Sequence, residues 1–380
     1  MYRYVNYVKE YGRIMQFNKN KDICIHRWYP FVEGYSKEFI EAIVNEQTQK
    51  VEFCLEPFSG SGTTALELSL KGISCISFEV NPFMFTLSKA KLKVSQYKRR
   101  TIKSHILKMK KHIASLNDNE IDLYSGFSTL IEGKEKKKWN IDREVFIAIE
   151  KLKRAINSLS TTLYKEVYII CLANILLEYS NLYRNGKCLS YKKDWKENLY
   201  SQEQVITSFF NFINNVIIED LEKLETKNFS NHDLLYLGDT RKLIFENVDD
   251  NSVDLIITSP PYLNSRDYTD SYMLELKALD FLTNYNDIKK LREQTIRSHV
   301  QLKIRNLKGV QSEILKSTIS EMEFLSKDSV AWNTEIQSMI IAYFEDMETI
   351  FNGMYQKLKK GRRIYFNVSN SAYFGVLINT

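Results

Sequence analysis

The amino-acid sequence predicts an α/β fold with a mostly parallel sheet and a large helical insertion. Three observations lead to this prediction. Short apolar segments alternate with helical segments over residues 51–92, which is typical of parallel sheets because their strands are buried on both faces. From about residue 96 to residue 228, apolar residues recur at the i, i+3, i+4 and i+7 spacing of helices. Apolar, strand-like segments then resume at residue 234.

Length and composition exclude several classes of protein. Of the 380 residues, 44% are hydrophobic, which is too many for a disordered chain. No uninterrupted apolar stretch approaches the roughly 18 residues of a membrane helix, and MYRYVNYVKEYGRIMQ does not resemble a signal peptide. The five cysteines are widely spaced and form no C-x-x-C pair, so we expect a cytoplasmic protein without disulfides or a zinc site. The net charge of +6 permits nucleic-acid binding without requiring it.

The first part of the chain predicts two strand–helix units. Residues 35–48 form the first expected helix, with Ser36 as its N-cap. VEFCLE predicts a buried strand at about 52–55, followed by a Gly/Ser loop and a helix that ends at Gly72. ISCISFE predicts a second strand at 74–79, after which NPFMFTLSKAKL begins another helix.

The remaining strands are expected after the helical insertion. LLYLGDT, VDLIITSPPY and RRIYFNVSN predict strands at about 234–238, 253–258 and 363–368, and residues 272–345 are mostly helical. The chain has only five prolines, at positions 30, 57, 82, 260 and 261. The two long stretches without proline therefore favour helices.

The Gly/Ser loop after the first expected strand is the first candidate site. Its sequence, EPFSGSGTT (residues 56–64), contains two glycines that allow a tight turn and a close approach to a ligand. The N–H groups that begin the next helix are available to polar atoms. The loop lacks the G-K-[ST] of a Walker loop and the third glycine of a dinucleotide fingerprint, so alone it would be interpreted as an ordinary turn.

Two carboxylates follow other expected strands at the same edge of the sheet. Glu79 ends the second strand, where nucleoside-binding α/β folds place a carboxylate that accepts hydrogen bonds from ribose. Asp239 follows the third strand and could lie beside an adenine ring. A single acid at such a position usually caps a helix. The three features together predict a ligand crevice at the carboxyl ends of the strands.

The segment 258–262, TSPPY, follows a further apolar strand and is the second candidate site. Its two prolines fix the backbone and leave carbonyl oxygens free to accept hydrogen bonds. The Ser259 hydroxyl and the Pro260 carbonyl could accept from an exocyclic amine, and Tyr262 offers a ring on which a flipped-out base can stack. A rigid turn is the alternative.

Together these motifs resemble those of the amino-methylating DNA methyltransferases, which transfer a methyl group from S-adenosylmethionine to the exocyclic amine of cytosine or adenine. EPFSGSGTT resembles the cofactor motif, FEVNP the ribose-binding motif, GDTRKL the motif near the cofactor adenine, and TSPPY the catalytic motif. WYPFVEGYSKEFI resembles the segment that closes over the methionine part of the cofactor, and LKKGRRIYFNVSNSAYFGV the strand after the catalytic motif. SNLYRNGKCLSY and SPPYLNSRDYTDSYMLEL resemble a recurrent subtype of this family.

The resemblance implies a Rossmann-like class I methyltransferase fold with S-adenosylmethionine as its cofactor. It implies a core of residues 1–95 and 234–380, a helical insertion of residues 96–233, and a helical segment, 285–345, that is a possible DNA contact. The implied catalytic residues are Ser259, Pro260, Pro261 and Tyr262. The implied cofactor contacts are Trp28, Tyr29, Glu56, Phe58, Ser59, Gly60, Ser61, Gly62, Thr63, Glu79, Val80, Asn81, Asp239 and Thr240.

Serine in the first position of S-P-P-Y is the form associated with methylation of cytosine N4, whereas Asn or Asp is associated more with adenine N6. We therefore expect cytosine N4 as the target, in a restriction–modification or related defence system. The amine nitrogen would attack the methyl group directly, so neither a catalytic cysteine nor a metal is expected. The alternatives are an adenine N6 enzyme, an RNA or protein methyltransferase, and a non-catalytic subunit.

Three basic clusters are candidates for contact with double-stranded DNA, whose phosphates require neutralising cations. Residues 89–111 contain many Lys and Arg and no acid, although such a run is often only a solvated helix face. A second cluster, at 184–196, interleaves basic and aromatic residues. A third spans 289–308 and includes His299, which is equally consistent with a surface role. The expected DNA contacts are Arg184, Lys187, Lys192, Lys193, Arg266 and Arg297.

The five expected strands are fewer than the seven typical of this methyltransferase class, and the chain ends soon after the fifth. We therefore expect an exposed apolar sheet edge. A second polypeptide would complete the sheet, or the chain is truncated. The alternative is that residues 272–345 or the N-terminal segment cover this edge.

Overall fold

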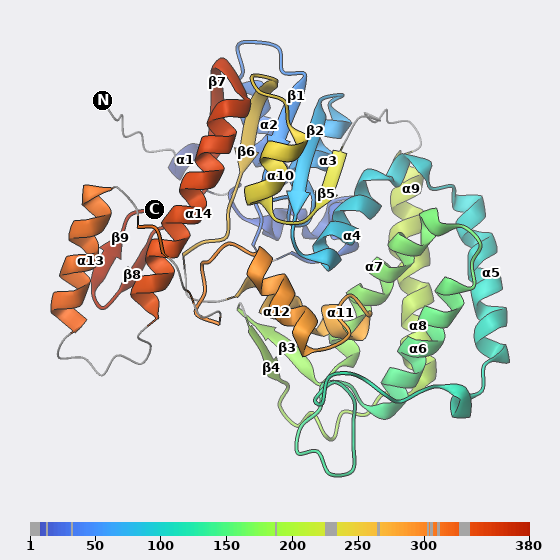
Figure 1. Ribbon diagram of the computed structural model, residues 1–380. Helices are drawn as coiled ribbons and strands as arrows, with labels where there is room; N and C mark the ends of the chain where they lie inside the picture. The colour runs from blue at the N-terminus through green and yellow to red at the C-terminus, as the bar shows by residue number, and fades with distance from the viewer. Residues whose placement is uncertain are drawn as a thin grey trace.

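The computed structural model describes residues 8–12, 14–31, 33–186, 188–224, 234–263, 267–301, 304, 307–309, 312–326 and 335–380. A parallel sheet of five strands, in the order β5-β2-β1-β6-β7, lies in its upper part (Figure 1). The strands are β1 (Phe53–Glu56), β2 (Ser74–Glu79), β5 (Leu234–Leu237), β6 (Val253–Thr258) and β7 (Leu358–Phe366). All five were expected from the sequence, which confirms the predicted α/β, Rossmann-like fold class.

Helices cover both faces of this sheet. Because neighbouring residues of a strand point to opposite faces, Leu255 and Ile257 pack with α2 (Lys37–Asn45) and α3 (Thr63–Leu70), whereas Ile256 packs with α10 (Thr240–Asn247) and α14 (Ile336–Lys357). The strands are apolar on both faces for this reason. α4 (Pro82–Leu92) follows β2.

The N-cap of α2 differs from expectation in one respect. The helix begins directly after Ser36, as expected, but the Ser36 hydroxyl makes no capping bond and donates to the carbonyl of Ile14 at 2.9 Å. It therefore attaches the preceding segment to the start of the helix.

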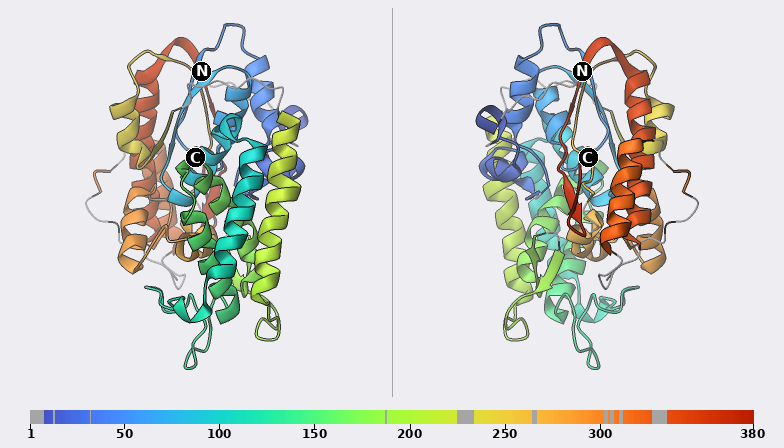
Figure 2. Two further views of the ribbon diagram at one scale, coloured as in Figure 1. Left: turned by 90° about the vertical axis from the view of Figure 1, so that its right-hand side faces the viewer. Right: turned by 90° about the vertical axis from the view of Figure 1, so that its left-hand side faces the viewer.

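The helical insertion lies beyond the carboxyl ends of the strands (Figure 1). Its helices are α5 (Arg99–Ser115), α6 (Arg143–Asn157), α7 (Thr162–Tyr179), α8 (Gln202–Phe212) and α9 (Glu219–Leu224), and a π-helix, Ile213–Ile218, joins the last two. Figure 2 shows α5 beside the continuous α8–α9 helix. The insertion shares one hydrophobic core with α4. The exact domain bounds stay a prediction.

Two short hairpins were not expected. β3 (Leu182–Asn185) and β4 (Cys188–Tyr191) form an antiparallel pair within the insertion, where the sequence analysis placed the second cluster of basic and aromatic residues. β8 (Ser371–Tyr373) and β9 (Val376–Ile378) form a second pair, although no further strand was expected after β7. β3, β4 and β8 lack the apolar run by which the equally short β1 was recognised, and β9 has only three residues.

β7 is the last strand at one edge of the main sheet. The β8–β9 hairpin stays separate from it and packs near α13 (Glu313–Ser326). Among the strands that the structure describes, β7 pairs only with β6.

The other helices connect these parts. They are α1 (Val8–Tyr11), α11 (Met273–Ala278), α12 (Tyr285–Gln294) and the 3-10 helices Phe17–Asp22, His26–Trp28, Val94–Gln96, Asp118–Glu120 and Tyr268–Tyr272. Within the described part of the chain, no helix has the length and apolar character needed to cross a membrane.

Candidate active site

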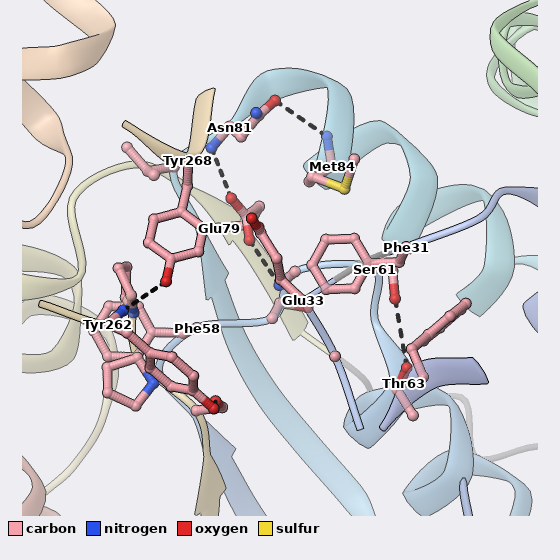
Figure 3. Close-up of a pocket in the computed structure, with 18 of the residues that line it drawn as sticks. Phe31, Glu33, Phe58, Ser61, Thr63, Glu79, Asn81, Met84, Tyr262 and Tyr268 are labelled. Carbon is pink, nitrogen blue, oxygen red and sulfur yellow. Dashed lines mark hydrogen bonds between the residues drawn. The ribbon is translucent and has the colours of Figure 1, made fainter. Parts of the chain in front are cut away.

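A cavity of about 650 Å³ lies where β1, β2 and β6 end. The loops that follow these strands line it with residues 58–61, 79–81 and 259–262, and Thr63 joins them from the start of α3. Residues 30, 31 and 33–35 form another wall, and residues 267–269 and 294–296 a further one. The two candidate sites of the sequence therefore face one space (Figure 3).

The glycine loop has no room for side chains at its two glycines. Gly60 and Gly62 have positive φ angles of 53° and 79°, which favour glycine. A Cβ on Gly60 would lie 2.9 Å from the ring of Phe31, and one on Gly62 would lie 2.8 Å from the Ser88 hydroxyl. The loop therefore depends on glycine for its conformation and for its packing.

Glu79 connects this loop with the next one. Its carboxylate accepts hydrogen bonds from the backbone N–H of Gly60 at 2.7 Å and of Asn81 at 2.8 Å (Figure 3). Burial raises the pKa of this carboxyl to about 7. The side chain of Asn81 in turn accepts from the N–H groups of Phe83 and Met84 and so caps α4.

Glu56 lies beneath the cavity and does not line it. Its carboxylate accepts from the Phe58 N–H at 3.1 Å and from the hydroxyls of Tyr35, Thr64 and Thr258, at 2.8, 2.7 and 2.6 Å. Burial raises its pKa to about 7. Glu56 thus connects the glycine loop with the residue that precedes Ser259, and its geometry favours a positioning role over direct ligand contact.

Side-chain hydrogen bonds fix the S-P-P-Y segment. The Ser259 hydroxyl donates to the Tyr262 hydroxyl at 3.3 Å, and the side-chain amide of Asn367 donates to the same oxygen at 3.3 Å. The Tyr262 N–H donates to the hydroxyl of Tyr268 at 3.0 Å (Figure 3). Sequence reasoning gave no role to Asn367 or Tyr268. Asn367 could have been found only from strand order, because β7 lies beside β6.

Ser59 carries a buried polar atom without a partner. The residue is 8% exposed and lines the cavity, and its hydroxyl has no hydrogen-bond partner among the described residues. Leaving such a group unpaired costs free energy. A polar ligand in the cavity would satisfy it.

The other expected cofactor residues divide into two groups. Ser61, Thr63, Val80 and Thr240 line the cavity. Gly62, Trp28, Tyr29 and Asp239 do not. The Asp239 carboxylate instead caps α10 and pairs with the guanidinium of Arg241 at 2.8 Å. Trp28 and Tyr29 are fully buried behind the cavity wall.

Three of the six expected DNA contacts engage protein groups. Arg184 lines the cavity and pairs with the buried carboxylate of Glu275 at 2.6 Å. Lys192 donates to the carbonyls of Glu178 and Ser180, which end α7. Arg297 pairs with Glu345 and Asp346. Lys193 is exposed, whereas Lys187 and Arg266 lie outside the described residues.

His299 is not a surface histidine. It is 1% exposed, lines the cavity and lies 3.1 Å from the Thr295 hydroxyl through Nε2. Among the described residues, no group of three His, Cys, Asp or Glu side chains is arranged to hold a metal.

The chain is similar to type II methyltransferases over nearly its whole length. It is 25% identical to the type II methyltransferase M.BsoBI of Geobacillus stearothermophilus, over 99% of this chain and 81% of that protein. It is also 25% identical to M.AvaI of Nostoc sp., over 97% of this chain and 78% of that protein. M.MvaI of Kocuria varians is 25% identical over 66% of this chain and 55% of its own length. No family model matches the chain.

Proposed function

We propose that this protein is a sequence-specific DNA methyltransferase that transfers a methyl group from S-adenosylmethionine to the exocyclic amine of a flipped-out base. The observation that carries the proposal is the single cavity shared by the glycine loop and the S-P-P-Y segment. The similarity to type II methyltransferases supports it, and supports a place in a restriction–modification system.

The cofactor side of the cavity suits S-adenosylmethionine. Gly60 allows close approach of the ligand, Glu79 offers carboxylate oxygens to ribose hydroxyls, and Ser59 offers an unpaired hydroxyl. The rings of Phe31 and Phe58 provide apolar contact. When bound, the cofactor supplies an electrophilic methyl group.

The base side suits a planar amine. The Ser259 hydrogen points to Tyr262, so the lone pairs of its oxygen are available to an amine N–H, and the carbonyl of Pro260 can accept the second one. The ring of Tyr262, fixed by Asn367 and Tyr268, provides a face for the base. Holding both amine hydrogens orients the nitrogen lone pair for direct attack, and much of the rate comes from this orientation.

We propose cytosine N4 as the target, on the strength of Ser259. Host DNA should contain N4-methylcytosine when the protein is expressed, measured by mass spectrometry of nucleosides. N6-methyladenine without N4-methylcytosine would instead support the adenine alternative.

A surface on the insertion is suited to duplex DNA. The ring of Trp195 contacts those of Trp139 and Tyr191, with centroids 4.8 and 5.2 Å apart. Lys138 lies over Tyr191, and Lys196 lies 5.4 Å from the ring of Trp195. Both lysines are exposed. We call these five residues the lysine–tryptophan surface and propose that it contacts the DNA backbone.

A second polypeptide is not part of this proposal. It was expected from the number of strands, but the comparisons do not support it.

The decisive experiment is transfer of labelled methyl from S-adenosylmethionine to plasmid DNA, followed by sequencing of the modified positions. We expect modification at one recurring sequence. Transfer to RNA or protein but not to DNA would contradict the proposal, as would cofactor binding without any transfer.

A further inference from the structure

We propose that Asp220, in the helical insertion, is a positioning residue for cofactor binding. Asp220 does not line the cavity. Its carboxylate holds the segment 25–29, which leads directly into the cavity wall formed by residues 30, 31 and 33–35. This inference rests on the proposed function, because it concerns the same cavity.

The backbone of Ile25 has an unusual conformation. Its φ and ψ are 68° and −45°, values that a β-branched residue rarely adopts. Its N–H donates to Asp220 Oδ2 at 2.7 Å. Such a conformation persists only where surrounding contacts impose it, and it is found most often near functional sites.

The same carboxylate accepts hydrogen bonds from two further residues. Oδ2 accepts from the indole N–H of Trp28 at 2.9 Å, and Oδ1 accepts from Nε of Arg27 at 2.9 Å. Asp220 is fully buried, so these bonds are not exchanged for water. Charge-assisted bonds of this kind are about twice as strong as neutral ones. Asp220 thus fixes three residues in one turn of the chain.

Other groups of the insertion hold the residues that follow. The side-chain amide of Asn174, on α7, donates to the carbonyl of Trp28 at 3.2 Å. The guanidinium of Arg184, on β3, bonds the Tyr29 hydroxyl, which also donates to Glu275 at 2.6 Å. Groups of the insertion therefore hold Ile25, Arg27 and Trp28, whereas His26 bonds Glu67 of α3 at 2.8 Å and Tyr29 also bonds Glu275 of α11.

The next residues contact the glycine loop. The ring of Phe31 lies against Gly60, where a Cβ would be only 2.9 Å away, and stacks on Tyr272 with 6.0 Å between centroids. The Tyr35 hydroxyl bonds Glu56 beneath the loop. A shift of residues 25–29 would move Phe31, and with it the space between this wall and the glycine loop.

The test is the dissociation constant of S-adenosylhomocysteine, measured by titration calorimetry. Asp220→Asn removes the charge but keeps the size of the side chain, and should raise the constant about tenfold or more, which corresponds to about 1.4 kcal/mol. Trp28→Phe keeps an aromatic ring but removes one hydrogen-bond donor. It should raise the dissociation constant about threefold, which corresponds to about 0.7 kcal/mol. Glu219→Gln is the matched control. Glu219 also pairs with Arg27 but is half exposed, so we expect no change in affinity.

Two further measurements separate a positioning role from a loss of folded protein. Thermal unfolding of each variant shows whether it is folded at the titration temperature. If Asp220→Asn is unfolded at that temperature, the affinity of Trp28→Phe tests the proposal. In methyl transfer, we expect a raised KM for the cofactor with kcat nearly unchanged, a division that simple loss of folded protein would not produce. Unchanged affinity in the folded variants would overturn this inference alone, whereas no binding by the unaltered protein would overturn the proposed function as well.

Discussion

Glu56 and Glu79 end neighbouring strands, and burial raises the pKa of both carboxyls to about 7, but their surroundings differ. Glu56 accepts bonds from three hydroxyls and one N–H beneath the loop. Glu79 accepts from two N–H groups and also faces the cavity. A carboxylate can accept about four hydrogen bonds. Glu79 can therefore accept further hydrogen bonds from a ligand, whereas protein groups already occupy the acceptor positions of Glu56.

Cofactor affinity should therefore depend on pH through Glu79. If ribose hydroxyls donate to the ionised carboxylate, affinity is full above a pH of about 7 and falls as the pH drops through this pKa, because the protonated group offers fewer acceptors. Calorimetric titration between a pH of about 5.5 and about 8.5 would measure this. Two other groups titrate in the same range: burial raises the pKa of Glu56 to about 7 and lowers the pKa of Lys91 to about 7. The variant Glu79→Gln is therefore needed to assign the effect to Glu79. An unchanged pH profile in that variant would contradict the assignment.

Gly60 permits a test of close packing. Gly60→Ala places a Cβ 2.9 Å from Phe31 at a positive φ, and we expect cofactor affinity to fall about tenfold, equivalent to about 1.4 kcal/mol. Gly72→Ala is the matched control, because Gly72 also has a positive φ, of 72°, but a Cβ there meets no atom within 4 Å. It should lower stability by about 1–2 kcal/mol and leave affinity unchanged. Equal affinity in both variants would show that ligand approach does not depend on Gly60.

Tyr262 should matter for chemistry more than for DNA binding. Tyr262→Ala removes the ring on which the flipped base would stack, a contact of about 1–3 kcal/mol, so single-turnover methylation should slow at least tenfold. Duplex affinity, measured by fluorescence anisotropy, should change much less. Tyr262→Phe keeps the ring and removes only the oxygen that accepts from Ser259 and Asn367. Its methylation rate should therefore lie between those of the unaltered protein and Tyr262→Ala. A normal rate in Tyr262→Ala would make the segment a structural turn.

At the scale of elements, the β3–β4 hairpin has two distinct ends. Arg184, near its turn, is directed into the cavity wall and pairs with Glu275. Tyr191, at the other end, belongs to the lysine–tryptophan surface. The same short element thus joins the proposed DNA surface to the wall that holds Tyr29. Arg184 and Tyr191 are close in the sequence, but in the hairpin Arg184 lines the cavity whereas Tyr191 belongs to the proposed DNA surface.

The lysine–tryptophan surface should bind DNA through phosphates. Replacing Lys138 and Lys196 together with alanine should weaken duplex binding to a similar degree for every sequence. It should also reduce the slope of log affinity against log salt by about 0.9 for each phosphate that the protein no longer neutralises. Lys71→Ala, at an exposed position after α3, is the control and should change neither quantity. A salt slope that stays constant in the double variant would exclude these lysines from the interface.

At the scale of the whole molecule, local patterns predicted what depends on local sequence. The buried strands, the glycine loop and the S-P-P-Y turn were all predicted, because burial on both faces and special backbone angles leave a signal in a few adjacent residues. Contacts between residues that are far apart in the chain left no such signal in the sequence. Asp220 meets Ile25, and Asn367 meets Tyr262, only through packing of elements far apart in the chain. Asp239 was expected near a ligand because it follows a strand, and its pairing with Arg241, two residues later, was not anticipated.

Core and insertion should unfold as one unit. One hydrophobic cluster includes residues of both, among them Phe83 and Leu87 of α4 and residues of α5–α7, and Asp220 adds buried bonds between core and insertion. Heat unfolding can be monitored by far-ultraviolet circular dichroism, which helices dominate, and by near-ultraviolet signals, to which aromatic residues around the cavity contribute. The two unfolding transitions should have the same midpoint temperature. Saturating S-adenosylhomocysteine, at a free concentration about 100 times its dissociation constant, should stabilise the folded state by about 2.7 kcal/mol and shift both signals together. If the ligand shifted only the near-ultraviolet transition, the insertion would be an independent unit, and the coupling proposed for Asp220 would lose its structural basis.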